Sequence, residues 1–369
     1  MDIKELKEKV SEIKDPRRQY GNLRHKLEDI VIIGLLSTIS MGEDFEDMEI
    51  FGRNREKWLK TFLELPNGIP DSDTFRRLFE RLEPNELSKC LNTCLESLKE
   101  NQEKGIVINI DGKTINGSGN NEHNPYNVVS VWDSENQITL AEMKTEDKSN
   151  EIKIVPALLD LVSIEGSIVT ADAMNCQKNI VKKIIEKKAD YVIALKGNQG
   201  TLYDDVELYF NDSCISKKGV ETFDLDHGRI ERREYYFESN IDWLIEKSEW
   251  SNLKGVGMVK TKVEEKGKGV VRNSTRYYIS SLCDISSFAY SVRKHWSIEN
   301  QLHWCLDVVF REDSSKVRKD NSPLNMNVLR KAALSLLKKV NIGKISLRKK
   351  MYSAALDFEI LNKIVFGEK

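Results

Sequence analysis

The sequence lacks the marks of a zinc-stabilised, disulfide-bonded or membrane-bound protein. Its six cysteines are scattered over 369 residues without a Cys-x-x-Cys pair, so neither a zinc site nor a disulfide framework is indicated. Cys90 and Cys94 lie four residues apart on an amphipathic stretch, which favours buried thiols. No apolar run has the length of a membrane span, and the N-terminus lacks the charged-then-apolar order of a signal peptide. We therefore expect a protein that stays in the cytoplasm.

A strong net charge is also absent. The formal net charge of -2 argues against a uniformly basic nucleic-acid binder. Basic residues nevertheless concentrate between Arg311 and Lys350, where 12 lysines or arginines accompany only three acids, Glu312, Asp313 and Asp320. Such a stretch can neutralise DNA phosphates and release their counterions. It can equally be a solvated helix face, and charge alone does not decide between the two.

The composition is that of a folded protein large enough to be an enzyme. Hydrophobic residues make up 40% and charged residues 31% of the chain, and the length of 369 residues exceeds a usual single core. Changes in pattern divide the chain into five segments. These are an N-terminal helical domain at 1–101, the first part of an α/β core at 102–214, a β-rich insertion at 215–284, the completion of the core at 285–345 and a C-terminal helix at 346–369.

The N-terminal segment is a candidate for DNA binding. After Pro70, an Asp or Ser cap precedes a predicted helix with an apolar inner face that includes Phe75 and Leu78. Arg76, Arg77 and Arg81 would lie on its outer face. Such a helix could sit on DNA as in a helix-turn-helix protein, although a plain structural bundle is the commoner outcome.

The segment from 102 to 214 alternates between strand and helix patterns in a fixed order. Five runs have a strand pattern, at 105–111, 127–132, 138–143, 167–170 and 191–195. Three have a helix pattern, at about 151–162, 177–187 and 199–210. Three antiparallel strands followed by alternating helices and strands predict a mixed sheet with helices on both faces.

The rest of the chain switches to a β pattern and then back to helix. Short alternating runs at 231–237, 255–262 and 276–280 indicate a β-rich insertion. Helices are expected at about 286–309, 323–340 and 346–364.

Two aspartates end buried strands of the predicted core. Asp111 follows Ile108-Asn109-Ile110, and Asp172 follows Ile168-Val169-Thr170-Ala171. In an open sheet, the carboxyl ends of strands face a ligand crevice. A buried carboxylate needs a metal, a basic partner or water. Either aspartate alone could equally form a turn or a cap, so the pair is more specific than either member.

A third acid lies on the helix expected from 286 to 309. Glu299 is four residues from both His295 and His303, and Asp307 continues the series along one face. The face could line a cleft, or it could be solvated with incidental histidines. Two strand-end aspartates and a glutamate brought over on a helix would converge hard oxygen ligands on divalent metal ions. His303 suits a phosphate-binding or orienting role better than a metal ligand, because Mg²⁺ sites seldom use imidazole.

Several motifs together resemble one known family. In chain order they include Asp111-Gly112-Lys113-Thr114, Lys148-Ser149-Asn150-Glu151-Ile152, Thr170-Ala171-Asp172-Ala173-Met174, Ala194-Leu195-Lys196-Gly197-Asn198-Gln199-Gly200, His227-Gly228-Arg229-Ile230-Glu231-Arg232-Arg233 and His295-Trp296 to Glu299-Asn300. They are similar to those of the H-repeat-associated group of bacterial insertion-sequence transposases. The match is collinear and covers nearly the whole chain.

The resemblance implies a DDE transposase with a ribonuclease-H-like core, a β-rich insertion and a helical N-terminal domain. It implies that Asp111, Asp172 and Glu299 are the catalytic, metal-binding triad and that two Mg²⁺ or Mn²⁺ ions are the cofactors. The implied reaction is cleavage of DNA at transposon ends and strand transfer into target DNA. The implied partners are double-stranded DNA, as terminal inverted repeats and target, and a second copy of the chain in a homodimer. Such a protein would be associated with the bacterial nucleoid.

The basic partners of the triad depart from more distant relatives. Those relatives carry an Arg four residues before the glutamate and a Lys seven after it, whereas this chain has His295 and Leu306. The role of that lysine would pass to His303, Arg311 or Lys316. The other predicted nucleic-acid contacts are Lys113, Lys196, Asn198, Gln199, Arg229, Arg232, His295 and Arg318.

Some of these residues have a plain structural alternative. Lys196 could simply end a strand, and Asn198 and Gln199 could cap a helix instead of contacting bases. Trp243 and Trp250 could stack on a flipped base, but core packing is the commoner role.

Three functions remain open at this point. They are a transposase, a hydrolytic nuclease of the same fold, and a catalytically idle DNA-binding protein of transposase origin. Three intact acids argue against the third, because a binding protein needs no converging carboxylates. The sequence does not separate the first two.

Overall fold

The chain forms two compact units. The computed structural model describes residues 2–17, 23–97, 99, 105–120, 123–145, 151–212, 219–226, 229–265 and 270–367. Unit 1 comprises Met1–Gln102, Gly112–Lys148 and Ile298–Lys369, and unit 2 comprises Glu103–Asp111 and Ser149–Ser297. Strand β1 (Val107–Ile115) begins in unit 2 and ends in unit 1. The expected helix cap at Ser149 and Asn150, and the histidine at position 227, lie outside the described residues.

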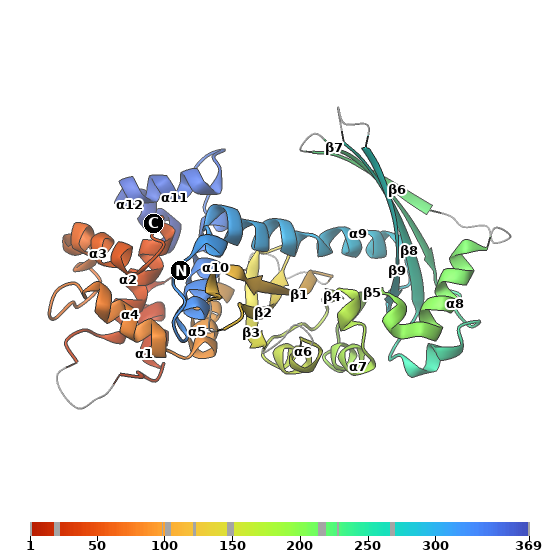
Figure 1. Cartoon of the computed structure of the whole chain (residues 1–369), viewed down its shortest axis with the longest axis horizontal. Coiled ribbons are helices and arrows are strands. Elements are labelled where there is room, and N and C mark those ends of the chain that lie inside the picture. Colours follow the sequence, from red (N-terminus) through yellow and green to blue (C-terminus); the bar gives the residue numbers. More distant parts are fainter. Residues whose placement is uncertain are drawn as a thin grey trace. The chain divides into compact units, whose positions relative to one another are not determined.

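Unit 1 is built mainly from helices. They are α1 (Ile3–Ser11), α2 (Leu27–Ile39), α3 (Phe45–Leu59), α4 (Ser72–Arg81), α5 (Pro84–Glu96), α10 (Ser322–Lys339), α11 (Leu347–Leu356) and α12 (Phe358–Phe366) (Figure 1). Helix α2 is apolar nearly all round and packs against α10, so both are buried. Asn325 of α10 donates hydrogen bonds to the carbonyl oxygens of Phe79 and Leu82, at 2.8 and 2.9 Å. Segments from the two ends of the sequence therefore share one core.

The arginines of α4 are neutralised on their own helix. Arg76 pairs with Asp73 and Glu80, at 2.8 Å each, and Arg77 pairs with Asp73 at 3.3 Å. Asp71 caps the helix by accepting a hydrogen bond from the backbone N–H of Thr74, as the Asp or Ser cap in the sequence predicted. The outer face of α4 is therefore less positive than its three arginines suggest.

Unit 1 also contains the strand hairpin of β2 (Tyr126–Asp133) and β3 (Ile138–Thr145). The two strands are antiparallel, and α5 and α10 pack against β3. Lys331 of α10 forms a buried ion pair with Glu142 and donates a hydrogen bond to Ser130 at 2.9 Å. No described helix, in either unit, is long and apolar enough to cross a membrane.

The parallel strands lie in unit 2. Strand β4 (Ile168–Ala171) pairs in parallel with β1 on one side and with β5 (Asp190–Leu195) on the other. Helices α6 (Glu151–Asp160) and α7 (Lys178–Glu186) lie on one face of these strands, and α9 (Ile285–His295) lies on the other (Figure 1). The predicted mixed sheet with helices on both faces is confirmed.

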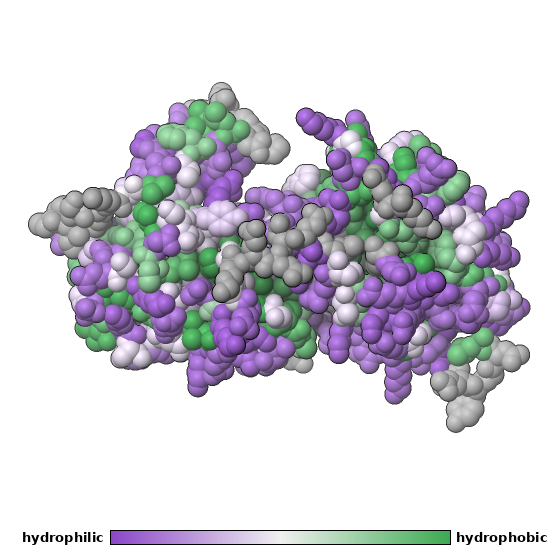
Figure 2. Space-filling model, turned by 180° about the vertical axis from the view of Figure 1, so that it is seen from behind, coloured by the Kyte–Doolittle hydropathy of each residue, from purple (hydrophilic) through white to green (hydrophobic). Residues whose placement is uncertain are grey.

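The predicted insertion continues the same sheet. Helix α8 (Gly200–Asn211) leads into β6 (Gly219–Asp226), β7 (Arg229–Glu238), β8 (Gly255–Glu265) and β9 (Val270–Ser280). These four strands are antiparallel, and β9 pairs with β5, which gives the order β1-β4-β5-β9-β8-β7-β6 in unit 2. Phe223 and Leu225 of β6 are 64% and 71% exposed. Figure 2 shows apolar patches among hydrophilic ones on the face of the molecule that it draws.

Candidate active site

Asp111 and Asp172 directly follow paired residues of two neighbouring parallel strands. Ile110 of β1 is in register with Ala171 of β4; Asp111 comes next in β1, and Asp172 is the first residue after β4. Neighbouring strands lie about 4.8 Å apart, so the two aspartates occupy adjacent positions. Both are half-buried. Strand β1 itself runs on to Ile115, past the end expected from the sequence.

Asp172 also shapes the loop that follows β4. Its Oδ1 accepts hydrogen bonds from the backbone N–H and the side-chain amide of Asn175, at 3.2 and 3.0 Å. These bonds close the short helical turn Ala173–Asn175. Asp172 is therefore a cap as well as a residue at the carboxyl edge of the sheet. Because both bonds go to Oδ1, they fix the orientation of the carboxylate and leave Oδ2 out of the cap.

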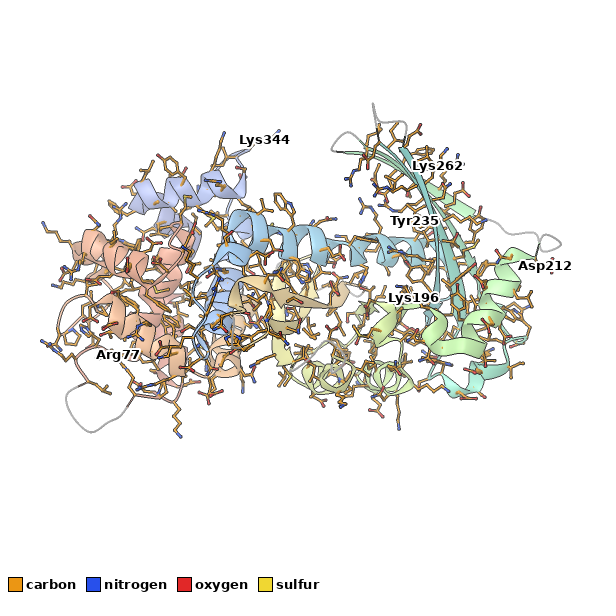
Figure 3. The ribbon with its side chains drawn as sticks, in the orientation of Figure 1. Arg77, Lys196, Asp212, Tyr235, Lys262 and Lys344 are labelled. Carbon is orange, nitrogen blue, oxygen red and sulfur yellow. The ribbon has the colours of Figure 1, made fainter. Side chains whose placement is uncertain are left out.

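The loop after β5 supports the Asp172 loop. The side-chain amide of Asn198 donates to the carbonyl oxygen of Ala173 at 2.9 Å, and that of Gln199 donates to Cys176 at 2.8 Å. These bonds give both amides a structural role, and the base contacts considered from the sequence stay a prediction. Lys196 is exposed beyond the end of β5, and it forms no ion pair with the part of the chain that the structure describes (Figure 3).

A buried network of four polar side chains lies beneath the aspartates in unit 2. Asn109 donates to the hydroxyl of Thr170 at 2.7 Å and accepts from the hydroxyl of Ser297 at 3.0 Å. The Thr170 hydroxyl is also 3.0 Å from Nδ1 of His295. Asn109 and Thr170 stand two residues before Asp111 and Asp172, so they share their face of the sheet. The network therefore joins the end of α9 to the two strands that present the aspartates.

His295 belongs to this network as a neutral group. Burial lowers the pKa of its imidazole to about 4, although the charge of Asp172 acts in the opposite direction. The cation that His295 was expected to offer to phosphates is therefore absent near pH 7. Its role here is to bind Thr170 and hold the helix end.

We expect Thr170→Val to lower the free energy of unfolding by about 1 to 3 kcal/mol, because the buried amide of Asn109 loses its acceptor. Urea unfolding followed by circular dichroism measures the loss. The matched control is Thr201→Val, at an exposed site on α8, which should stay within about 0.5 kcal/mol of the wild type. Equal losses in the two variants would contradict the network's role.

Lys113 is an internal residue of unit 1. Its ammonium group lies 2.7 Å from a carboxylate oxygen of Asp307 and 3.2 Å from one of Glu312, and its side chain is 9% exposed. Burial by itself would lower the pKa of Lys113, but the two carboxylates outweigh it and raise that pKa. The charge of Lys113 is therefore already balanced inside unit 1, and the phosphate contact expected of it stays a prediction that these ion pairs do not support.

Glu299 is exposed on an unusual helical segment of unit 1. After α9 the chain makes π-helical turns over Ile298–His303 and Cys305–Val309. Such wide turns are rare and occur frequently at functional sites. Lys338 of α10, absent from the sequence-based candidates, donates to the carbonyl oxygen of Gln301 at 2.7 Å and so supports the turn that presents Glu299.

His303, on the same segment, is half-buried and uncharged near neutral pH. Burial, with the nearby cations Lys331 and Lys113, lowers the pKa of its imidazole to about 3. The phosphate-binding role expected to pass to His303 therefore cannot rest on a positive charge.

Some of the remaining predicted cations have a partner within the protein, and others make no ion pair with described residues. Arg232 pairs with Glu221 and Glu234, and Arg318 donates to the carbonyl oxygen of Gly117 at 3.1 Å. Arg311 pairs with Glu43 at 3.2 Å. Arg229 and Lys316 are exposed and make no ion pair with described residues.

The two tryptophans of the insertion have packing roles. Trp250 is 2% exposed and belongs to the core. Trp243 is stacked on Tyr209, with ring centroids 4.6 Å apart. Trp250 therefore has the commoner role, core packing. In Trp243, the ring face that stacks on Tyr209 is not open to a base.

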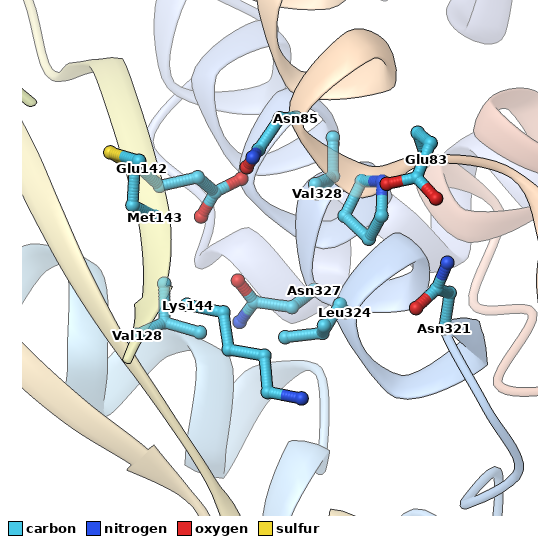
Figure 4. Close-up of a pocket in the computed structure, with 11 residues that line it drawn as sticks. Glu83, Asn85, Val128, Glu142, Met143, Lys144, Asn321, Leu324, Asn327 and Val328 are labelled. Carbon is cyan, nitrogen blue, oxygen red and sulfur yellow. The ribbon is translucent and has the colours of Figure 1, made fainter. Parts of the chain in front are cut away.

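Among the residues that the structure describes, neither a ready-made cluster of metal ligands nor the unit 1 cavity lined by Glu142 coincides with the candidate acids. Within the described ranges, no three Asp, Glu, His or Cys side chains gather closely enough to hold a metal ion by themselves. A cavity of about 150 Å³ in unit 1 is lined by Glu142, Lys144 and Asn327, among others (Figure 4). It contains none of the three candidate acids.

The strand order and the two aspartates define a mixed α/β core that presents two acids from neighbouring parallel strands. Residues 102–336 match the family described as Transposase DDE domain, and residues 7–94 match the family described as DDE_Tnp_1-associated. The chain belongs to the DDE transposase family, as its motifs indicated.

Relatives of similar length exist in Escherichia coli. The chain is 36% identical to "Putative transposase YncI" of strain O157:H7, over 97% of this chain and 93% of the relative. It is 34% identical to "H repeat-associated putative transposase YhhI" of strain K12, over 100% of this chain and 99% of the relative. A solved structure of the piggyBac transposase synaptic complex with hairpin DNA is similar at a TM-score of 0.43 and 14% identity, over 98% of this chain and 78% of that one.

Proposed function

We propose that this transposase cleaves DNA at the ends of a mobile element and joins the freed 3′ ends to target DNA. The observation that supports this best is that Asp111 and Asp172 directly follow the registered pair Ile110 and Ala171 of β1 and β4. A buried hydrogen-bond network lies under the pair, and Asn175 orients one of its carboxylates. Carboxylates placed and oriented in this way suit phosphoryl transfer rather than DNA binding alone.

We propose Glu299 as the third acid of the site. The proposal is supported by a hydrogen bond and an ion pair that two residues of β1 make, one before and one after Asp111. Asn109, two residues before Asp111, binds Ser297 within unit 2, and Lys113, two residues after it, binds Asp307 within unit 1. Glu299 lies between Ser297 and Asp307 in the chain. Each of these two bonds joins β1 to a residue near Glu299 in the sequence, one within unit 2 and the other within unit 1.

The carboxylates fit a divalent metal cofactor. Mg²⁺ is usually held by one or two carboxylates, with water and substrate phosphates completing its oxygen shell. Asp111 and Asp172 would supply that pair of protein ligands, and Glu299 a further one. When bound, the ions would activate water or a 3′-hydroxyl and stabilise the leaving oxygen. Asn175 and the network under β1 and β4 would keep the aspartates oriented, which limits the reorganisation needed during the reaction.

We propose Lys196 as the first phosphate contact beside the acids. It is exposed and follows β5, the strand next to β4, whose end leads into Asp172. The loop that begins with Lys196 also donates two hydrogen bonds to the Asp172 loop. A phosphate bound there would be held at a fixed place relative to Asp172. We propose Arg229 and Lys316, which are both exposed, as further contacts to DNA phosphates.

A strand-transfer assay tests the proposal. The full-length protein is incubated with labelled DNA carrying the element's own ends, a supercoiled target plasmid and Mg²⁺ or Mn²⁺. We expect metal-dependent cleavage at the ends and covalent joining to the plasmid, and neither with scrambled ends. Cleavage without joining would identify a nuclease of the same fold, and no product with either metal would overturn the enzymatic proposal.

A further inference from the structure

The structure accounts for most of the basic residues between Arg311 and Lys350. Seven of the 12 bind carboxylates or backbone carbonyl oxygens within unit 1: Arg311, Arg318, Lys319, Arg330, Lys331, Lys338 and Lys350. Most of these cations therefore already have a partner within unit 1, although Arg311 and Lys319 are still 58% and 66% exposed. The other cations of this stretch occupy only a few positions.

Three of the remaining cations gather at the start of α11. Lys344 lies on the loop before the helix, and Arg348 and Lys349 lie in its first turn (Figure 3). All three are exposed, and none forms an ion pair with a described residue. The sequence contains no Asp or Glu from Asn341 to Leu356 that could neutralise them. We call these three residues the α11 basic surface.

The α11 basic surface is held on a fixed backbone. Met351 and Ala354 are buried where α11 packs against α2 and α10. Lys350 donates to the carbonyl oxygens of Leu337 and Val340, at 2.9 and 2.6 Å, and so fixes the start of α11 to the end of α10. Arg348 and Lys349 consequently project from an anchored helix, and Lys344 from the loop that leads into it.

The positive charges of this surface are electrostatically unfavourable when no anion is bound. The first turn of a helix carries a partial positive charge and favours acids. Helices α3 and α4 of the same unit follow this rule, with Glu46, Asp47 and Asp73 in their first turns. In α11, Arg348 and Lys349 stand there instead. A bound polyanion would remove the repulsion.

We propose that Lys344, Arg348 and Lys349 bind the phosphate backbone of double-stranded DNA. This rests on the proposed function, which requires the protein to hold duplex DNA, and it assigns part of that task to α11 rather than α4. A membrane fits less well, because the apolar face of α11 is already buried within the protein. Tyr352, four residues after Arg348 and 57% exposed, adds a hydroxyl to the same side of the helix.

The salt dependence of DNA binding tests the proposal. The full-length wild type and the triple variant Lys344→Gln/Arg348→Gln/Lys349→Gln are titrated onto a labelled 30-base-pair duplex between 50 and 200 mM KCl. Each lost phosphate contact lowers the slope of log K against log salt by about 0.9, so the variant's slope should be smaller by roughly 2 to 3. The control Arg53→Gln/Arg76→Gln/Arg77→Gln also removes three cations, but these are paired with acids, so its slope should change by less than about 1.

The possible results of this titration distinguish a failure of the α11 proposal from a failure of the proposed function. An unchanged slope in the α11 variant, or an equal fall in the control, would overturn the role of α11 even if the wild type cleaves and joins DNA. Loss of binding to phosphatidylserine vesicles with an unchanged duplex slope would replace DNA by a membrane as the partner. A wild type that binds no duplex at all would overturn both proposals.

Discussion

Asp172→Asn should reduce the yield of joined DNA at least about a thousandfold relative to the wild type, with either Mg²⁺ or Mn²⁺. Metal assistance is worth several kcal/mol, and each 1.36 kcal/mol changes the rate tenfold. Asparagine has nearly the shape of aspartate, and its oxygen can still accept both bonds from Asn175, so the turn after β4 is retained. The neutral amide, however, cannot balance the charge of a divalent ion. Denaturing gels of labelled ends measure both cleavage and joining.

The control for this variant is Asp204→Asn. Asp204 is an exposed carboxylate on α8, in the same unit, and its loss changes the net charge by the same amount. We expect the control to keep wild-type activity and the Asp172→Asn protein to keep its circular dichroism spectrum. An Asp172→Asn protein with more than a tenth of the wild-type product would remove Asp172 from the proposed metal site.

The local pattern of the sequence was sufficient to predict the strands and their acids. Short β-branched runs bounded by polar residues located β1, β4 and β5, and the order of elements predicted the mixed sheet. Asn109 and Thr170 were also visible as polar residues within apolar runs, each two positions before an aspartate. That spacing signals a shared face, and it could have indicated the buried network.

Contacts between distant parts of the chain could not be predicted in this way. Lys113 follows Asp111 by two residues, which made it a plausible phosphate ligand, but its partners Asp307 and Glu312 lie almost 200 residues further on. The sequence shows where His295 and His303 stand, but it does not show whether they are charged. Their charge depends on burial, which lowers the pKa of both imidazoles and cannot be read from a single sequence. By contrast, Asp73 and Glu80 stand three and four residues from Arg76, so the neutralisation of α4 was open to prediction.

Glu312 links Lys113 to the buried helix α10, and its removal should have the largest effect on stability. The Glu312 side chain is fully buried. It accepts a hydrogen bond from Asn327 at 2.8 Å and pairs with Arg330 at 3.3 Å and with Lys113 at 3.2 Å. Burial would raise the pKa of Glu312, but Arg330 and Lys113 outweigh it and hold that pKa below its ordinary value.

We expect Glu312→Gln to lower the free energy of unfolding by about 3 to 5 kcal/mol at pH 7, because Arg330 is left buried without its only carboxylate among the described residues. Urea unfolding at pH 7 measures the loss. The control Glu165→Gln removes one partner of an exposed pair with Lys188 and should cost less than about 1 kcal/mol. A Glu312→Gln protein as stable as this control would show that the buried pair contributes nothing.

The same contribution should depend on pH with a defined sign. Because the folded state lowers the pKa of Glu312, its stabilisation is complete above the ordinary value of 4.5 and is lost as pH falls through the lower pKa of the folded state. Glutamine does not titrate, so the gap in unfolding free energy between the wild type and Glu312→Gln should be constant from pH 7 to about 5 and narrow below about 4.5. A gap that widens toward acid would mean that Glu312 is protonated in the folded protein, and Lys113 would then be balanced by Asp307 and Asp313.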